Sequence, residues 1–265
     1  MKKNGRFKDA FGFILMMIVA VILWAFIVWV FQIKPYILPG PIAVIKTLLS
    51  SWKAIAPNLL VTINEIIIGY ILTVIISIPC ATLISYSRAF ERTVYPLLLL
   101  LQLIPKVAIA PLFIIWFGFG IYPKIFMVFL LSFFPLLIDS VVGFKSLNPR
   151  LIYVAKSMTD SEWDFFWKIR LPNALPNIFS GLKVSIAFAT VGAIVGEFVG
   201  SDKGLGYLLL RANGDLNTQL LFAVLLVLSI VGIILYEMIE LLEKIAIPWH
   251  VTKRQKLSGG DNATL

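Results

Sequence analysis

The sequence predicts an all-α integral membrane protein, and two observations lead to that class. Hydrophobic residues make up 60% of the 265 positions, and the mean hydropathy is +0.94. A soluble domain is usually about half apolar. The apolar residues also gather in runs long enough to cross roughly 30 Å of hydrocarbon. We therefore expect a polytopic helical protein that forms one domain over residues 1–265.

Six apolar runs are expected to cross the bilayer as helices. The first follows a basic amino end, but it is longer than the ~7–15 apolar residues of a signal peptide, so we expect it to be retained. The predicted spans cover residues 11–31, 59–86, 94–117, 125–142, 178–199 and 219–242. Proline interrupts several of them and is expected to kink the chain, at Pro79, Pro105, Pro111 and Pro135.

The loops predict the orientation. With the amino end inside, the inner segments hold 15 of the 23 Lys and Arg residues and the outer segments hold 6. An excess of positive charge marks the cytoplasmic side, so both termini are expected there. Anionic lipid at the inner leaflet then accounts for the net charge of +9 without nucleic acid. The outer loop contains an amphipathic run, residues 42–52, that is expected to lie along the membrane surface.

The segment between the fourth and fifth spans, residues 148–177, is polar and longer than a turn requires. It predicts two short amphipathic helices with a break at Thr159-Asp160 and a stop at Leu171-Pro172. Thr159 and Glu162 have the spacing of a capping box for the second helix. A docking site for a soluble partner explains this segment, and a helix lying on lipid headgroups explains it equally well.

Polar groups inside the spans are costly and therefore informative. The candidates are Asn64, Glu65, Lys106, Asp139, Lys183 and Glu197. Glu65, Asp139 and Lys183 lie near span ends, where they are expected to reach water or to pair. Glu197 lies near the outer end of the fifth span, where an interfacial carboxylate and a gate are both reasonable interpretations.

The fifth span carries small residues at helical spacing. One row comprises Gly181, Ser185, Ala189 and Ala193, and a second comprises Gly192, Gly196 and Gly200. Small residues four apart let helices approach closely in lipid. We expect this span to pack against another helix or against a second copy of the chain, and to line the interface and pathway through Ala189, Ala193 and Glu197.

Enzymatic chemistry is not expected. Cys80 and His250 are the single Cys and His, and they lie far apart, which argues against a disulfide, a metal site or a catalytic dyad. The glycine-rich segment 200–206 lacks the Lys-Ser/Thr end of a phosphate loop. No cofactor is predicted, and a partner ATPase is the expected source of energy.

These motifs resemble the permease subunits of bacterial binding-protein-dependent ABC importers. Residues 148–177 are similar to the family's cytoplasmic signature, in which a Glu-Ala-Ala run and a later Gly mark the coupling helices. The closing pattern matches at Leu171, Pro172, Pro176 and Gly181, and Ala155 matches the last Ala. Tyr153 stands where Glu is usual and Thr159 where Gly is usual. The resemblance implies coupling roles for Tyr153, Ala155, Met158, Thr159, Asp160, Trp163, Leu171 and Pro172.

The resemblance covers nearly the whole chain. Residues 104–105, 110–112, 116–120, 134–135, 196–197 and 204–207 look like the subfamily that imports sulfonates, nitrate, taurine and thiamine or riboflavin precursors. The carboxyl part, residues 216–250, looks more like the permeases for pyrimidine, riboflavin or other aromatic precursors. The resemblance implies an inner-membrane homodimer, two cytoplasmic ATPase subunits and an external solute-binding protein. An ion-coupled carrier and a membrane-embedded enzyme are the alternatives.

Overall fold

The computed structural model describes residues 3–148, 150, 152–153, 157 and 161–249, and every secondary-structure element among them is a helix. Four uninterrupted helical runs in this part of the chain are long and apolar enough to cross a membrane. They are α3 (Trp52–Tyr86), α6 (Ile121–Lys145), the run from Glu162 that ends in α9 (Leu171–Gly200), and α11 (Thr218–Ala246). The helical class is confirmed; the count of six spans is not.

The first and third predicted spans explain the difference in count. In α1 (Lys3–Val30), the apolar part whose side chains are described, Leu15–Val30, is shorter than a full crossing. The third span is broken into α4 (Arg88–Gln102), the 3₁₀ turn η1 (Lys106–Ile109) and α5 (Ala110–Phe117). Its two arms are bent by 86°.

Proline explains where the third span breaks. Pro105 precedes η1, lacks an N–H for the helix ladder and disfavours a helical conformation at the residue before it. The break predicted at Pro105 is therefore present. Pro79 and Pro135 lie within continuous helices, α3 and α6.

The long helices pack around α6, which makes its most extensive contact with α9 and then with α3. Glycines permit the close approach of α6 and α9. A Cβ added at Gly192 would lie 2.7 Å from Val128 Cα, and one added at Gly196 would lie 2.9 Å from Lys124 Cα. The close packing predicted for the fifth span is confirmed, with α6 as its partner.

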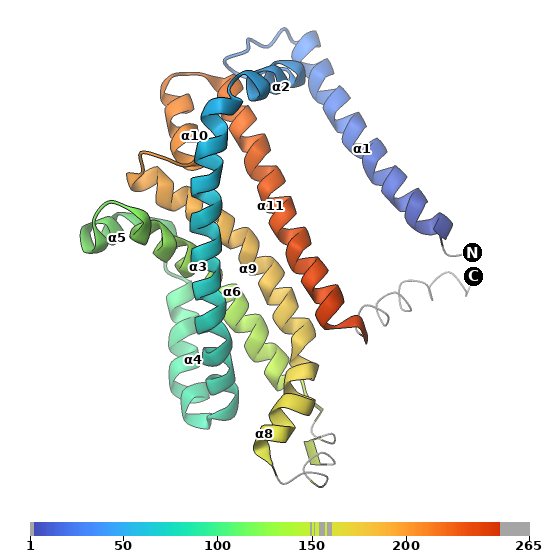
Figure 1. Ribbon diagram of the computed structural model, residues 1–265, viewed down its shortest axis with the longest axis vertical. Coiled ribbons are helices and arrows are strands. Elements are labelled where there is room, and N and C mark those ends of the chain that lie inside the picture. The colour runs from blue at the N-terminus through green and yellow to red at the C-terminus, as the bar shows by residue number, and fades with distance from the viewer. Residues whose placement is uncertain (1–2, 149, 151, 154–156, 158–160, 250–265) are drawn as a thin grey trace.

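The helices run between two ends of the molecule (Figure 1). α8 (Glu162–Phe165) lies at one end, whereas the start of α1 and the end of α11 lie to the side of the bundle, short of that end. Two short helices lie at the other end, α2 (Pro41–Ser50) and α10 (Leu205–Gly214). The amphipathic run predicted at 42–52 thus forms a helix, and most of its length is α2.

The predicted stop at Leu171-Pro172 is wrong. The chain stays helical from α8 through a π-helical turn, η2 (Phe166–Arg170), into α9. Pro172 lies in the first turn of α9, directly after the π-helical turn. The predicted cap at Thr159 also differs, because α8 is capped by Ser161, whose hydroxyl accepts from the Asp164 N–H at 3.3 Å.

Candidate functional site

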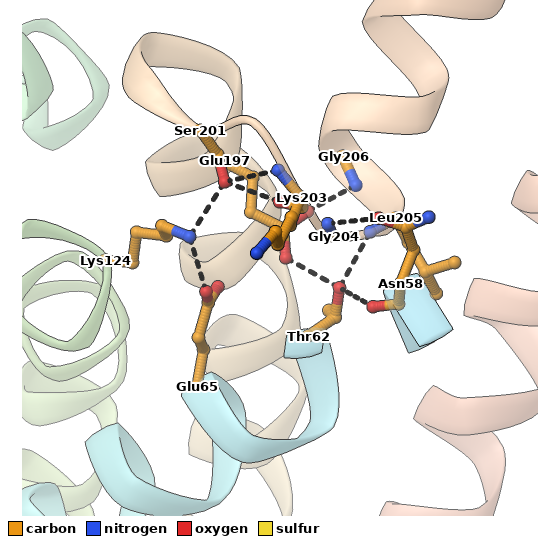
Figure 2. Close-up of polar contacts among 10 residues, drawn as sticks. All are labelled: Asn58, Thr62, Glu65, Lys124, Glu197, Ser201, Lys203, Gly204, Leu205 and Gly206. Atoms are coloured by element: carbon orange, nitrogen blue, oxygen red, sulfur yellow. Dashed lines mark hydrogen bonds and ion pairs between the residues drawn. The ribbon is translucent and has the colours of Figure 1, made fainter. Parts of the chain in front are cut away.

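A buried polar cluster lies where α3, α6 and α9 meet the loop before α10 (Figure 2). We define the polar cluster as Asn58, Thr62, Glu65, Lys124 and Glu197. Glu65, Lys124 and Glu197 are 1%, 6% and 0% exposed. Charges buried this deeply require partners, because the unpaired ions would be strongly unfavourable.

Lys124 pairs with Glu65 at the start of α6. The Lys124 ammonium lies 2.7 Å from Glu65 Oε1 and also donates to Ser201 Oγ at 2.8 Å. These bonds join α3, α6 and the loop that follows α9. The expectation that Glu65 pairs near its span end is confirmed. Lys124 falls just outside the predicted span 125–142, but it lies inside α6 and is the buried partner of Glu65.

Glu197 receives hydrogen bonds from two directions. Thr62 Oγ1 donates to Glu197 Oε1 at 2.6 Å, and the Gly206 backbone N–H donates to Glu197 Oε2. Thr62 Oγ1 in turn accepts from the Leu205 N–H at 2.8 Å. One carboxylate of α9 therefore fixes the first turn of α10 against α3.

Two glycines make this arrangement sterically accessible. Gly204 has φ +109°, a backbone conformation that side chains disfavour, and its N–H donates to Asn58 Oδ1 at 2.7 Å. A Cβ at Gly206 would lie 2.9 Å from Glu197 Oε2. The contact with the Glu197 carboxylate thus explains why glycine occupies positions 204 and 206 of the 204–207 motif.

The three predicted pathway residues lie inside one protomer. Ala189, Ala193 and Glu197 are each 0% exposed, and Ala189 and Ala193 pack into a core formed with α3, α10 and α11. Their side chains therefore do not form a surface that a second copy would touch. The exposed face of α9 carries other residues, Val184, Phe188 and Val191, which are 43%, 45% and 47% exposed.

Two cavities border Phe188 on that face of α9. One, of about 340 Å³, is lined by residues that include Lys106 and Phe134. The other, of about 390 Å³, lies between α9 and α11 and contains the Lys183–Glu243 ion pair. The expected pairing of Lys183 is therefore present. Asp139 lies half-buried on α6, and no ion pair is formed by it within the described residues.

The predicted coupling segment is described only in part. Ala155, Met158, Thr159 and Asp160 lie outside the described residues. Tyr153 is 80% exposed and Trp163 is 70% exposed, whereas Leu171 and Pro172 are half-buried at the start of α9. Tyr153 and Trp163 thus offer exposed aromatic surface within this segment.

α8 and η2 are anchored to the end of α3. Phe165 is 2% exposed, the Phe166 and Tyr86 rings are 6.0 Å apart, and the Arg170 guanidinium lies 4.1 Å from the Tyr86 ring centroid. Trp163 projects from this base and packs against Trp167 with ring centroids 5.5 Å apart. The exposed aromatic surface is therefore held on a fixed support.

Long apolar helices that pack around buried ion pairs define a polytopic helical membrane protein. The family of binding-protein-dependent transport system inner membrane components matches residues 69–245, and the chain belongs to that family. It is accordingly a transporter permease subunit and not an enzyme.

Named relatives extend this family assignment. The chain is 34% identical to the formylaminopyrimidine transport permease ThiX of Halalkalibacterium halodurans, over 82% of this chain and 87% of the relative. It is 33% identical to the riboflavin transport permease RibX of Chloroflexus aurantiacus, over 93% of each chain. It is 30% identical to the putative aliphatic sulfonates permease SsuC of Bacillus subtilis, over 94% of this chain and 91% of the relative.

Proposed function

We propose that the chain carries a small organic solute inward across the bacterial inner membrane, and that the solute is a pyrimidine, thiamine-type or riboflavin-type aromatic precursor. The similarity that supports this choice is to relatives named for formylaminopyrimidine and riboflavin, at 34% and 33% identity. The relative named for sulfonates, at 30%, supports the alternative of a sulfonate, taurine or nitrate importer. Residues 1–265 act as one permease domain in this proposal.

Energy comes from partner subunits in this proposal. Two cytoplasmic ATPase subunits dock on residues 148–171, and the exposed Trp163 and Tyr153 supply contact area on a supported surface. ATP binding closes the ATPase pair, moves this segment and opens the pathway outward, and hydrolysis resets it. Both chain termini lie on the same cytoplasmic side.

The working unit is a homodimer. The exposed face of α9, with Val184, Phe188 and Val191, is apolar enough to face a second copy or a solute. The two cavities that border Phe188 lie along this face and give it space for a solute. An external solute-binding protein delivers the solute at the end that carries α2 and α10.

Glu197 acts from behind the pathway as the acceptor that holds α10 at its outer mouth. The bonds from Thr62 and Gly206 support this role over a direct contact with solute. Glu197→Gln should keep part of the transport activity if hydrogen bonding is what matters, and lose it if the charge is needed. Uptake that is unimpaired in Glu197→Ala would remove Glu197 from the proposal.

Co-purification and reconstitution test the whole proposal. The tagged permease should retain an untagged ATPase from its own host and should show ATP-dependent uptake of a labelled pyrimidine when the binding protein is added outside liposomes. Uptake driven by an ion gradient, without any ATPase, would favour an ion-coupled carrier. Uptake of taurine in preference to the pyrimidine would favour the sulfonate-type alternative.

A further inference from the structure

The cavity beside the break in the third span has a composition that apolar packing alone does not explain. Its volume is about 340 Å³, within the range of small-molecule sites. α4 ends at Gln102 and the chain turns at Pro105 into η1, and the cavity lies between the end of α4, η1, α6 and α9. Phe134, Ile138 and Phe188 line it, and the polar side chains among its lining residues are Gln102 and Lys106.

Lys106 is half-buried, and it differs from the two lysines that form ion pairs inside the bundle. Lys124 and Lys183 are paired with Glu65 and Glu243. Across the part of the chain that the structure describes, no carboxylate lies within 4 Å of the Lys106 ammonium. A cation in a mostly apolar site without a counter-charge is costly to keep.

Helix capping uses only part of the hydrogen-bonding capacity of Lys106. Its ammonium donates to the Gln102 carbonyl oxygen at 2.7 Å, which stabilises the end of α4. It also lies 4.8 Å from the Phe134 ring centroid. An ammonium has three N–H donors, so further donor capacity remains in the cavity.

We propose that this cavity is a subsite of the transport pathway, in which Lys106 binds an oxygen acceptor of the solute, either an anionic oxygen or a carbonyl. Phe134 and Phe188 provide the apolar and aromatic walls for the rest of a small ring-bearing molecule. Phe188 is 45% exposed and also borders the second cavity, which continues the route along α9. The proposal rests on the transport function proposed above and adds the chemistry that selects the solute.

Thiol labelling tests the charge of the cavity without any transport. Single cysteines replace Phe188 or Ile138 in a Cys80→Ala background, in membranes that contain the full chain. The probes are methanethiosulfonate ethylsulfonate, an anion, and methanethiosulfonate ethyltrimethylammonium, a cation. We expect the anion to react faster at both cysteines. Adding Lys106→Met should reduce the anion-to-cation rate ratio by about fivefold or more, as expected for the loss of a unit charge a few ångströms away.

Two controls isolate the contribution of Lys106. Lys106→Arg keeps the charge and should keep the preference for the anion. A cysteine at Leu216, which is 78% exposed and lies outside the cavity, should show the same rate ratio with or without Lys106. An unchanged ratio in Lys106→Met at both cavity cysteines, or no reaction at either cysteine, would overturn the subsite.

A transport assay separates the subsite from the function on which it rests. In liposomes with the ATPase and binding protein, Lys106→Met should lower uptake of the labelled pyrimidine severalfold. Stimulation of the ATPase by the loaded binding protein should persist. Uptake at the wild-type rate in that variant would overturn the subsite but leave the importer assignment intact. Absence of ATP-driven uptake in the unmodified protein would instead contradict the proposed function.

Discussion

Single residues explain why the buried charges of this bundle are tolerated. Glu65 pairs with Lys124, and Glu197 receives one hydroxyl and one backbone donor. The sequence could predict that Glu65 and Glu197 require partners, since both are carboxylates inside apolar runs. It could not predict Lys124 and Thr62 as those partners, because Lys124 adjoins a run boundary and Thr62 resembles an ordinary helix residue. The available signal in the sequence was that Glu65 and Lys124 carry opposite charges and lie near the same predicted side of the membrane.

The Glu65–Lys124 pair yields a prediction about stability. Removing one member of a buried pair typically costs about 3–5 kcal/mol, because the remaining charge is left unpaired. Lys124→Met should therefore lower the stability of the detergent-purified protein strongly, and Glu65→Gln in the same chain should restore most of the loss. Thermal unfolding followed by far-UV circular dichroism measures the stability of the single and the double variant.

An exposed pair provides the control for that prediction. Lys168 and Asp164 lie 2.7 Å apart, with side chains that are 71% and 43% exposed. Surface pairs at this helical spacing contribute about 0.3–0.5 kcal/mol, so Lys168→Met should barely shift the transition. Equal effects of Lys124→Met and Lys168→Met would mean that the buried pair does not hold α3 and α6 together.

At the scale of elements, sequence patterns predicted which helices form better than where they bend. Pro105 breaks its span by 86°, yet Pro79 and Pro135 remain inside α3 and α6. Burial does not separate these prolines, because Pro135 lies on the well-buried α6 but Pro79 is exposed on α3. The small residues of α9 correctly indicated close packing, but a pattern on one helix does not identify its partner.

The α6–α9 contact predicts unequal effects of two glycine substitutions. Gly192→Ala would place a methyl group 2.7 Å from Val128 Cα, so backbone must shift. Overpacking of this kind costs about 1–3 kcal/mol. Gly232→Ala on α11 meets nothing within 4 Å and should be neutral or stabilising by up to about 1 kcal/mol through helix propensity. The midpoint temperature of thermal unfolding in detergent should be higher for Gly232→Ala than for Gly192→Ala. The reverse order would contradict the close packing of α6 and α9.

The support beneath Trp163 predicts a docking phenotype. Trp163→Asp replaces an exposed aromatic surface with a charge and leaves Phe165 and Arg170 in place, so folding should persist. We expect at least a tenfold loss of ATPase co-purification, because an interface core does not accept an unpaired carboxylate. Trp249→Asp, at a tryptophan that is 55% exposed outside residues 148–177, is the matched control and should retain the ATPase. Full ATPase recovery with Trp163→Asp would favour the alternative that this segment lies on lipid headgroups.

At the scale of the whole molecule, charge counting and the fold agree about which segments share a side. The sequence assigns the termini and residues 148–177 to one side by the split of 15 to 6 basic residues. Figure 1 shows α2 and α10 at one end of the molecule and α8 at the other, and both α1 and α11 extend away from the end that carries α2 and α10. The two arguments are independent, since one uses loop charge and the other uses helix connectivity. The bent third span brings the start of α6 beside the loop that precedes α10, where Lys124 donates to Ser201 Oγ at 2.8 Å.

Accessibility of single cysteines tests which of those ends faces the cytoplasm. In a Cys80→Ala background, cysteines at Ser51, beside α2, and Asn213, in α10, should react with an impermeant maleimide added to intact cells. Cysteines at Ser157 and Ser258 should react only after the membrane is permeabilised, because the basic segments stay inside. Permeabilised cells provide the control that each thiol is reactive at all. Labelling of Ser157→Cys in intact cells would reverse the orientation and, with it, remove residues 148–171 from reach of a cytoplasmic ATPase.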